Sequence, residues 1–171
     1  MKTALIACMA LVLLSGVACT RTRNASYKDN VQKALEQADL KDVNVSEDQD
    51  KNTITLSGKL HSDDAKQRAA EIAQSAADGR VIANEISVEP VGNESAARKI
   101  ESNVDGAIEK NYKAALIANG LDKADIRFDA KNGVLTLKGK VKSADQRQQA
   151  QVVAASVPNV AQVVNEIQVS R

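Results

Sequence analysis

The sequence is nearly devoid of aromatic side chains. Aromatic residues make up 2% of the chain: there is no tryptophan, and Tyr27, Tyr112 and Phe128 are the whole set. Single-stranded nucleic acid and sugar rings are bound largely by stacking on aromatic faces, so this composition argues against both kinds of ligand. The single histidine, His61, lies in a polar turn, and the sequence supplies no partners that would make it a base or a metal ligand.

Catalytic motifs are also lacking. The sequence contains no glycine loop that could cradle a phosphate, no HExxH and no cluster of cysteines. Asp63 and Asp64 form a carboxylate pair, but they follow Ser62 at the expected start of a helix, where acidic residues complement the helix dipole. We therefore predict a protein that is not an enzyme and has no cofactor, metal or small-molecule substrate.

The first 18 residues have the pattern of a targeting segment. Lys2 supplies a positive start, and the apolar run from Ala4 to Leu14 is too short to span a bilayer. Small residues then precede Cys19, and this arrangement resembles a bacterial lipoprotein signal. It implies that residues 1–18 are removed and that Cys19 is lipidated. The alternative is an ordinary secretory signal, with Cys19 on either side of the cut.

Lipidation would leave the protein without a thiol. Cys8 lies inside the removed segment and Cys19 would carry lipid, so nothing remains for a disulfide, a metal or catalysis. Residues 19–26 are polar and are expected to form a lipidated tether, of which residues 20–26 span at most about 25 Å. Thr20, and not Asp, follows the cysteine. By resemblance to enterobacterial lipoproteins, this implies anchoring in the outer membrane, facing the periplasm.

The rest of the chain is a duplication. Ile54–Leu60 (ITLSGKL) returns as Leu135–Val141 (LTLKGKV) after 81 positions, and the same offset places Asn84-Glu85-Ile86 on Asn165-Glu166-Ile167. A constant offset over so long a stretch indicates two copies of one structural unit.

Each copy has the pattern of a helix, two strands, a helix and a strand. We expect an α+β fold of two tandem αββαβ domains, each a mixed three-stranded sheet covered on one face by two helices. The domains are expected at residues 27–89 and 96–171, with a linker at 90–95. Ser26 with Asp29, and Ser143 with Gln146, are expected to cap helices.

These features resemble the BON domain. The resemblance rests on the order of elements, the Gly-Lys that closes each hairpin and the ending Asn-Glu-Ile-x-Val. Pro158-Asn159-Val160 matches the family well, whereas Asp78-Gly79-Arg80 replaces it in the first copy. With its signal, the chain resembles dual-BON outer-membrane lipoproteins of Gram-negative bacteria. That resemblance implies phospholipid binding and a role in envelope integrity. Of the residues typical of the family, only Gly58, Gly139 and the apolar positions can be assigned in this sequence.

The two copies differ in charge. Residues 27–90 contain 8 Lys or Arg and 13 Asp or Glu, a net charge of −5, whereas residues 94–171 contain 12 and 9, a net charge of +3. This asymmetry predicts different roles for the two domains, with drift on solvated surfaces as the alternative.

A row of cations is one candidate lipid-binding surface. Leu137 and Val141 need burial, so strand alternation directs the side chains between and after them to the opposite face of the sheet. The expected row consists of Lys138, Lys140, Lys142 and, on the neighbouring strand, Arg127. Each could contribute about 1 kcal/mol beside anionic headgroups. Alternatively, lysines here only keep the sheet face solvated and block edge pairing.

A helix offers the second candidate surface. Ile117 lies outside the expected buried stripe, and Lys113 is on the same flank, an arrangement that suits an interfacial helix. The sequence does not choose between helix and sheet. We expect the second domain to bind anionic phospholipid and support outer-membrane integrity. The rival hypothesis is an interaction module for envelope proteins that uses the anchor only for placement. No nucleic-acid partner is expected.

The lipidation hypothesis predicts the behaviour of Cys19→Ser. This variant should lose the diacyl anchor and the amide-linked chain, become soluble and migrate differently on a gel. Membrane fractionation of cells that express each form is the measurement. If the variant fractionates with membranes as the wild type does, the lipoprotein assignment is wrong.

Overall fold

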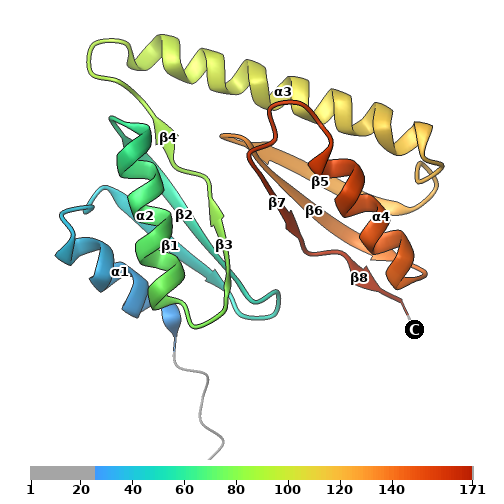
Figure 1. The fold of residues 1–171 in the computed structure, drawn as a ribbon, viewed down its shortest axis with the longest axis horizontal. Coiled ribbons are helices and arrows are strands. Elements are labelled where there is room, and N and C mark those ends of the chain that lie inside the picture. The colour runs from blue at the N-terminus through green and yellow to red at the C-terminus, as the bar shows by residue number, and fades with distance from the viewer. Residues whose placement is uncertain (1–25, 171) are drawn as a thin grey trace, which may run out of the picture.

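Two copies of one arrangement lie side by side in the computed structural model, which describes residues 26–170 (Figure 1). The predicted signal peptide and Cys19 lie outside the described residues. The first domain comprises α1 (Tyr27–Gln37), β1 (Val43–Asp48), β2 (Thr53–Leu60), α2 (Asp63–Ala76), β3 (Val81–Asn84) and β4 (Ser87–Val88). The second comprises α3 (Glu94–Ala118), β5 (Asp125–Lys131), β6 (Val134–Val141), α4 (Ala144–Ala155), β7 (Gln162–Asn165) and β8 (Gln168–Val169).

The sheet topology confirms the predicted fold. In each domain the first two strands form an antiparallel hairpin, and the strand after the second helix returns parallel to the middle strand. This third strand comes in two pieces, because β4 and β8 pair again with the far ends of β2 and β6. The register of the parallel pair is the same in both copies, since Leu56 pairs with Asn84 and Leu137 with Asn165.

An asparagine fixes each break in the third strand. The side-chain amides of Asn84 and Asn165 donate to the backbone oxygens of Lys66 and Arg147, at 3.0 and 3.2 Å. Their Oδ1 atoms accept from the backbone N–H two residues on, at 3.5 and 3.1 Å. Each asparagine therefore bonds backbone groups of two different segments.

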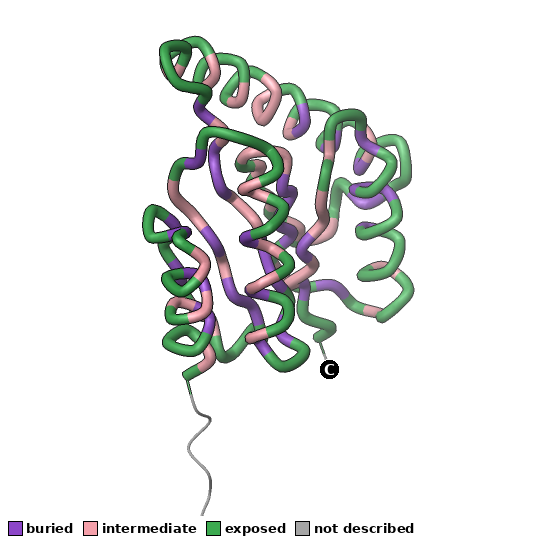
Figure 2. The backbone as a smooth tube through the Cα atoms, turned by 60° about the vertical axis from the view of Figure 1, so that its left-hand side comes forward, coloured by how far each residue is buried: buried purple, intermediate pink, exposed green. Residues whose placement is uncertain are grey.

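Both helices of each domain cover the same face of its sheet, and the hydrophobic core lies between the helices and that face (Figure 2). In the second domain Tyr112 is fully buried, its ring meets Phe128 edge-on at 5.0 Å, and its hydroxyl donates to Ala150 O at 3.2 Å. Burial raises the pKa of Tyr112 far above its usual value, because the core disfavours the phenolate.

Of the two helix caps that the sequence predicts, the structure contains one and lacks the other. Ser143 accepts from Gln146 N at 3.2 Å, which confirms its cap. The capping pair of Ser26 with Asp29 was wrong, because Ser26 makes no side-chain cap. Instead the Glu47 carboxylate, on β1, accepts from Ser26 Oγ at 3.0 Å and from Lys28 N at 3.4 Å. A carboxylate complements the helix dipole, and Arg80 holds this one at 3.3 Å.

The linker is shorter than expected. Residues 90–95 were assigned to it, but α3 begins at Glu94, after a turn in which Asn93 N donates to Pro90 O at 3.0 Å. The helix is long, at 25 residues, and Ala97, Ile100, Val104 and Ile108 follow one another along it at intervals of three or four.

Gly58 and Gly139 are matched positions that the hairpins require. Both have positive φ, +127° and +116°. A Cβ on Gly58 would lie 2.2 Å from Asp42 O, and one on Gly139 would lie 1.9 Å from Asp125 O. The partner strand therefore approaches too closely for any other residue.

We predict that Gly139→Ala lowers the free energy of unfolding by at least about 2 kcal/mol, because it combines a clash with a strained φ. Gly106→Ala, in α3, is the matched control: a Cβ there meets nothing within 4 Å. It should raise stability by about 0.5–1 kcal/mol through helix propensity. Urea unfolding followed by circular dichroism measures both, and equal effects would contradict the steric account.

Candidate functional site

The two domains meet through their edge strands, β3 and β7, which face each other in Figure 1. The side chain of Gln162, on β7, bonds the exposed edge of β3 as a peptide group would. Its Nε2 donates to Ile82 O, and its Oε1 accepts from Asn84 N at 3.3 Å. One glutamine thereby satisfies two edge groups that would otherwise invite pairing with another chain.

The contacts on either side of this glutamine are nearly reciprocal. Lys51 of the first hairpin turn pairs with Glu166 at 3.1 Å, and Lys131 of the second hairpin pairs with Glu85 at 2.9 Å. Glu85 and Glu166 occupy equivalent positions in the repeat, as do Ala83 and Val164, which are buried together with Val134. The interface thus approximates the twofold symmetry of a homodimer.

Docking covers part of the helix-free face of each sheet. Thr53 and Thr136 point to that face, and both are buried. On the face for which the lysine row was predicted, Lys138 and Lys140 of β6 are exposed, whereas Val134 and Thr136 of the same strand are buried.

Helix α3 fastens the two domains together through carboxylates. Glu101 accepts from Ser87 Oγ at 2.5 Å and from Val88 N at 3.0 Å in the first domain. In the second, Asp105 accepts from Asn132 N and Gly133 N at 2.8 and 3.0 Å, and Glu109 accepts from Ala130 N at 3.1 Å. These three acids follow one another at intervals of four residues, so they line a single side of the helix.

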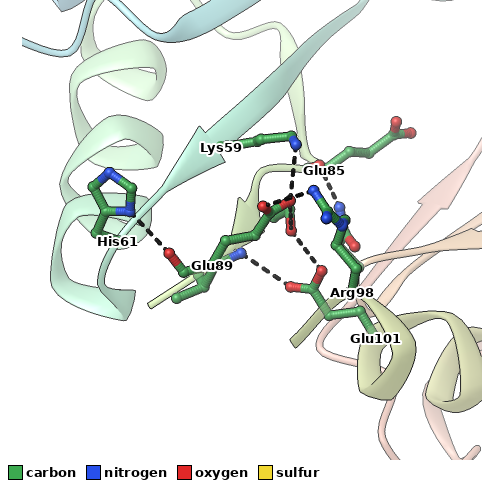
Figure 3. A network of polar contacts seen from close by, with 9 residues as sticks. Lys59, His61, Glu85, Glu89, Arg98 and Glu101 are labelled. Atoms are coloured by element: carbon green, nitrogen blue, oxygen red, sulfur yellow. Dashed lines mark hydrogen bonds and ion pairs between the residues drawn. The ribbon is translucent and has the colours of Figure 1, made fainter. Parts of the chain in front are cut away.

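Figure 3 shows how the start of α3 is held against the first domain. The Glu89 side chain is only 4% exposed, and Lys59 and Arg98 pair with it at 3.3 and 3.2 Å. The His61 ring contacts Glu89 O through Nδ1 at 2.8 Å. His61, Glu89 and Glu101 therefore serve the joint between the domains, a role that the sequence reasoning missed for both acids.

The side of α3 that is turned away from its buried residues is basic, and it borders the side that carries these acids. Lys99, Lys110, Lys113 and Ile117 are exposed, and at about 100° per residue they fall within about 60° of one another. We call these four residues the outer face of α3. They extend over about 27 Å of helix. No acidic residue lies among them, because the acids of α3 are half-buried on the inner side. Sequence reasoning found Lys113 and Ile117 but not Lys99 and Lys110.

The predicted sheet residues lie where strand alternation placed them. Lys138, Lys140, Lys142 and Arg127 are all exposed. Arg127 stands opposite Lys138, and Asp125 stands opposite Lys140. Asp125 also lies 3.8 Å from the Arg127 guanidinium. Lys142 follows the end of β6, so it is set apart from the other two lysines.

A hollow of about 610 Å³ lies between α2 and the second domain. Lys66 lines it and donates to Asn132 O at 3.2 Å. Burial lowers the pKa of Lys66, although Glu101, Asp63 and Asp105 act in the opposite direction. Within residues 26–170 no group of three His, Cys, Asp or Glu could hold a metal ion. Over the same residues, no helix has the length and apolar character needed to cross a membrane.

The comparisons identify the family. The model of the BON domain matches residues 24–90 and 104–171, so the chain belongs to the BON family and contains two such domains. This family is implicated in phospholipid binding and in the cell envelope, and it is not a family of enzymes.

Among solved structures, the chain is similar to two structures of CdsD, a structural protein of the type III secretion system of Chlamydia trachomatis. One, of the C-terminal domain, has 10% identity and a TM-score of 0.35, with 86% of this chain and 98% of that chain covered. The other has 12% identity and a TM-score of 0.35, with 83% and 91% covered. No match is found among curated proteins.

We predict that Gln162→Ala weakens the domain interface. The substitution leaves Ile82 O and Asn84 N without their partner, which should cost about 1–3 kcal/mol and separate the unfolding transitions of the two domains. Gln148→Ala, at an exposed position on α4, is the control and should change stability by less than about 0.5 kcal/mol. Urea unfolding by circular dichroism distinguishes them. A single, unshifted transition for Gln162→Ala would show that the glutamine does not hold the domains together.

Proposed function

We propose that this is a non-enzymatic lipoprotein, anchored through Cys19 to the periplasmic side of the outer membrane, whose second domain docks on anionic phospholipid and supports envelope integrity. The observation that carries the proposal is the segregation of charge on α3. Its acids are turned inward onto backbone N–H groups, and the three lysines of its outer face are exposed together.

The outer face of α3 has the chemistry of an interfacial helix. Ile117 is 57% exposed beside these lysines, so an apolar side chain can enter the headgroup region while the lysines meet phosphates. Each lysine contributes about 1 kcal/mol near an anionic surface. Together with the apolar contact of Ile117, this attraction supports binding of the domains to an anionic surface without the anchor.

The sheet row of Lys138, Lys140, Lys142 and Arg127 is the second candidate for lipid contact. Three features make it weaker. Asp125 lies among its cations, and docking of the first domain covers the adjoining half of the same face. Lys142 is also separated from the others by the end of β6.

A protein-interaction role without lipid binding is the competing function. The reciprocal contacts between the domains favour this role, because they show that the fold forms a protein interface within this chain. The two functions differ in whether the domains, without the anchor, bind vesicles.

Residues 20–171 should float with vesicles that contain phosphatidylglycerol and not with pure phosphatidylcholine. Replacing Lys99, Lys110 and Lys113 by Gln should weaken binding at least about tenfold and flatten its dependence on salt, because surface attraction is screened within about 8 Å at physiological ionic strength. Replacing Lys138, Lys140 and Lys142 by Gln is the charge-matched control, with a much smaller effect expected.

The opposite ranking of the two triple variants would move the lipid contact to the sheet. No flotation of residues 20–171 at any salt concentration would favour the protein-interaction role. Circular dichroism should show both variants folded, because all six lysines are exposed.

A further inference from the structure

The edge strand at the end of the first domain is occupied by a carboxylate of the chain itself. Glu101 of α3 accepts from Ser87 Oγ and from Val88 N, at 2.5 and 3.0 Å, on the helix-free side of β4 (Figure 3). Ser87 is buried as a result. The first domain therefore shows what kind of group this edge accepts: a carboxylate presented by a helix.

The equivalent edge of the second domain is exposed. Gln168 and Val169 correspond to Ser87 and Val88, and Val169 is 41% exposed. Ser170 N donates to Val141 O at 2.8 Å, as Glu89 N donates to Leu60 O at 2.8 Å. Since N–H groups alternate in direction along a strand, the Val169 N–H points out of the sheet edge, as the Val88 N–H does.

The surroundings of the second edge have changed from neutral or acidic to basic. Arg127 and Lys138 pair across the second hairpin where the first hairpin pairs Asn44 with Ser57. Lys140 corresponds to Lys59, which pairs with Glu89 at 3.3 Å, but the residue equivalent to Glu89 is Ser170. The second edge has thus gained two cations, and Lys140 has lost the carboxylate of its counterpart.

A hollow of about 340 Å³ lies beside this edge. Its charged lining consists of Lys51, Arg127, Lys138, Lys140 and Glu166. Lys51 is engaged by Glu166 and Asp48, and Arg127 faces Asp125, at 3.1, 2.9 and 3.8 Å respectively. Within residues 26–170, Lys138 and Lys140 have no carboxylate at ion-pair distance. These two lysines are therefore the cations available to a partner.

We propose that the edge of β8 and this hollow form a docking surface for an acidic helix of a protein partner. A carboxylate of that helix accepts from the Val169 N–H and lies beside Lys138 and Lys140, as Glu101 accepts from the Val88 N–H in the first domain. The exposed Val169 side chain supplies an apolar contact. This role goes beyond lipid docking and is compatible with it, because the helix-free face of the sheet is opposite to α3.

The test uses the lipidated full chain in phosphatidylcholine nanodiscs and a synthetic peptide with the sequence of residues 94–109 as the acidic probe. Amide chemical shifts of Gln168 and Val169 are followed by NMR as the peptide is added. We expect saturable shifts at both amides and none at Val88, whose N–H already has its carboxylate. A peptide with Glu101→Gln should bind about tenfold more weakly, the effect of losing one charge-assisted hydrogen bond.

On the protein, replacing Lys138 and Lys140 by Gln should also weaken peptide binding at least about tenfold, since both interfacial charges are lost. Lys33→Gln, an exposed lysine on α1, is the control and should bind as the wild type. The triple variant at Lys99, Lys110 and Lys113 should bind the peptide normally, so failure of lipid docking would not affect this result.

Three results would overturn the proposal. The first is the absence of saturable shifts at Val169. The second is equal binding of the Glu101→Gln peptide, which would show that no single carboxylate is recognised. The third is a shift of Val169 when phosphatidylglycerol replaces phosphatidylcholine, without any response to the peptide, which would assign the hollow to lipid.

Discussion

The meeting of β3 with β7 is the contact on which the rest of the structure depends. Each small domain has an edge strand, and the two edges meet through Gln162, which bonds the edge of β3, the two lysine–glutamate pairs and the buried Ala83, Val134 and Val164. A domain of this size is marginal alone, so mutual burial stabilises both. Docking also decides which sheet surfaces are covered, and it leaves α3 lying across both domains (Figure 1).

Duplication explains both the symmetry of this interface and the difference between the two equivalent sheet edges beside it. Equivalent residues meet across the interface, as in a homodimer, but the joining helix can cover only one of the two equivalent edges. Glu101 and Arg98 of α3 close the edge of β4, while β8 is exposed beside unpaired lysines. Part of the difference in charge lies at this edge, where Lys138 replaces Ser57 and Ser170 replaces Glu89.

Much of the fold was predictable from the sequence because it depends on local pattern. The 81-residue offset, strand alternation and the matched Gly58 and Gly139 gave the order of elements and the exposed lysine row. Contacts between distant elements were not predictable. Glu47 reaches the start of α1 from a strand, so Ser26 looked like the cap. The outer face of α3 could have been found, since the spacing of Lys99, Lys110 and Lys113 is helical, but the inward role of its acids depends on where the first domain docks.

We propose that the docked domains present the outer face of α3 to the membrane and turn the helix-free sheet face away from it. Paramagnetic relaxation of amide signals by a nitroxide lipid headgroup, with the lipidated protein in phosphatidylglycerol nanodiscs, measures this orientation. We expect strong broadening at Lys99, Lys110, Lys113 and Ile117 and little at Lys138, Lys140 and Val169. Broadening concentrated at the second group, or spread evenly over both domains, would contradict it.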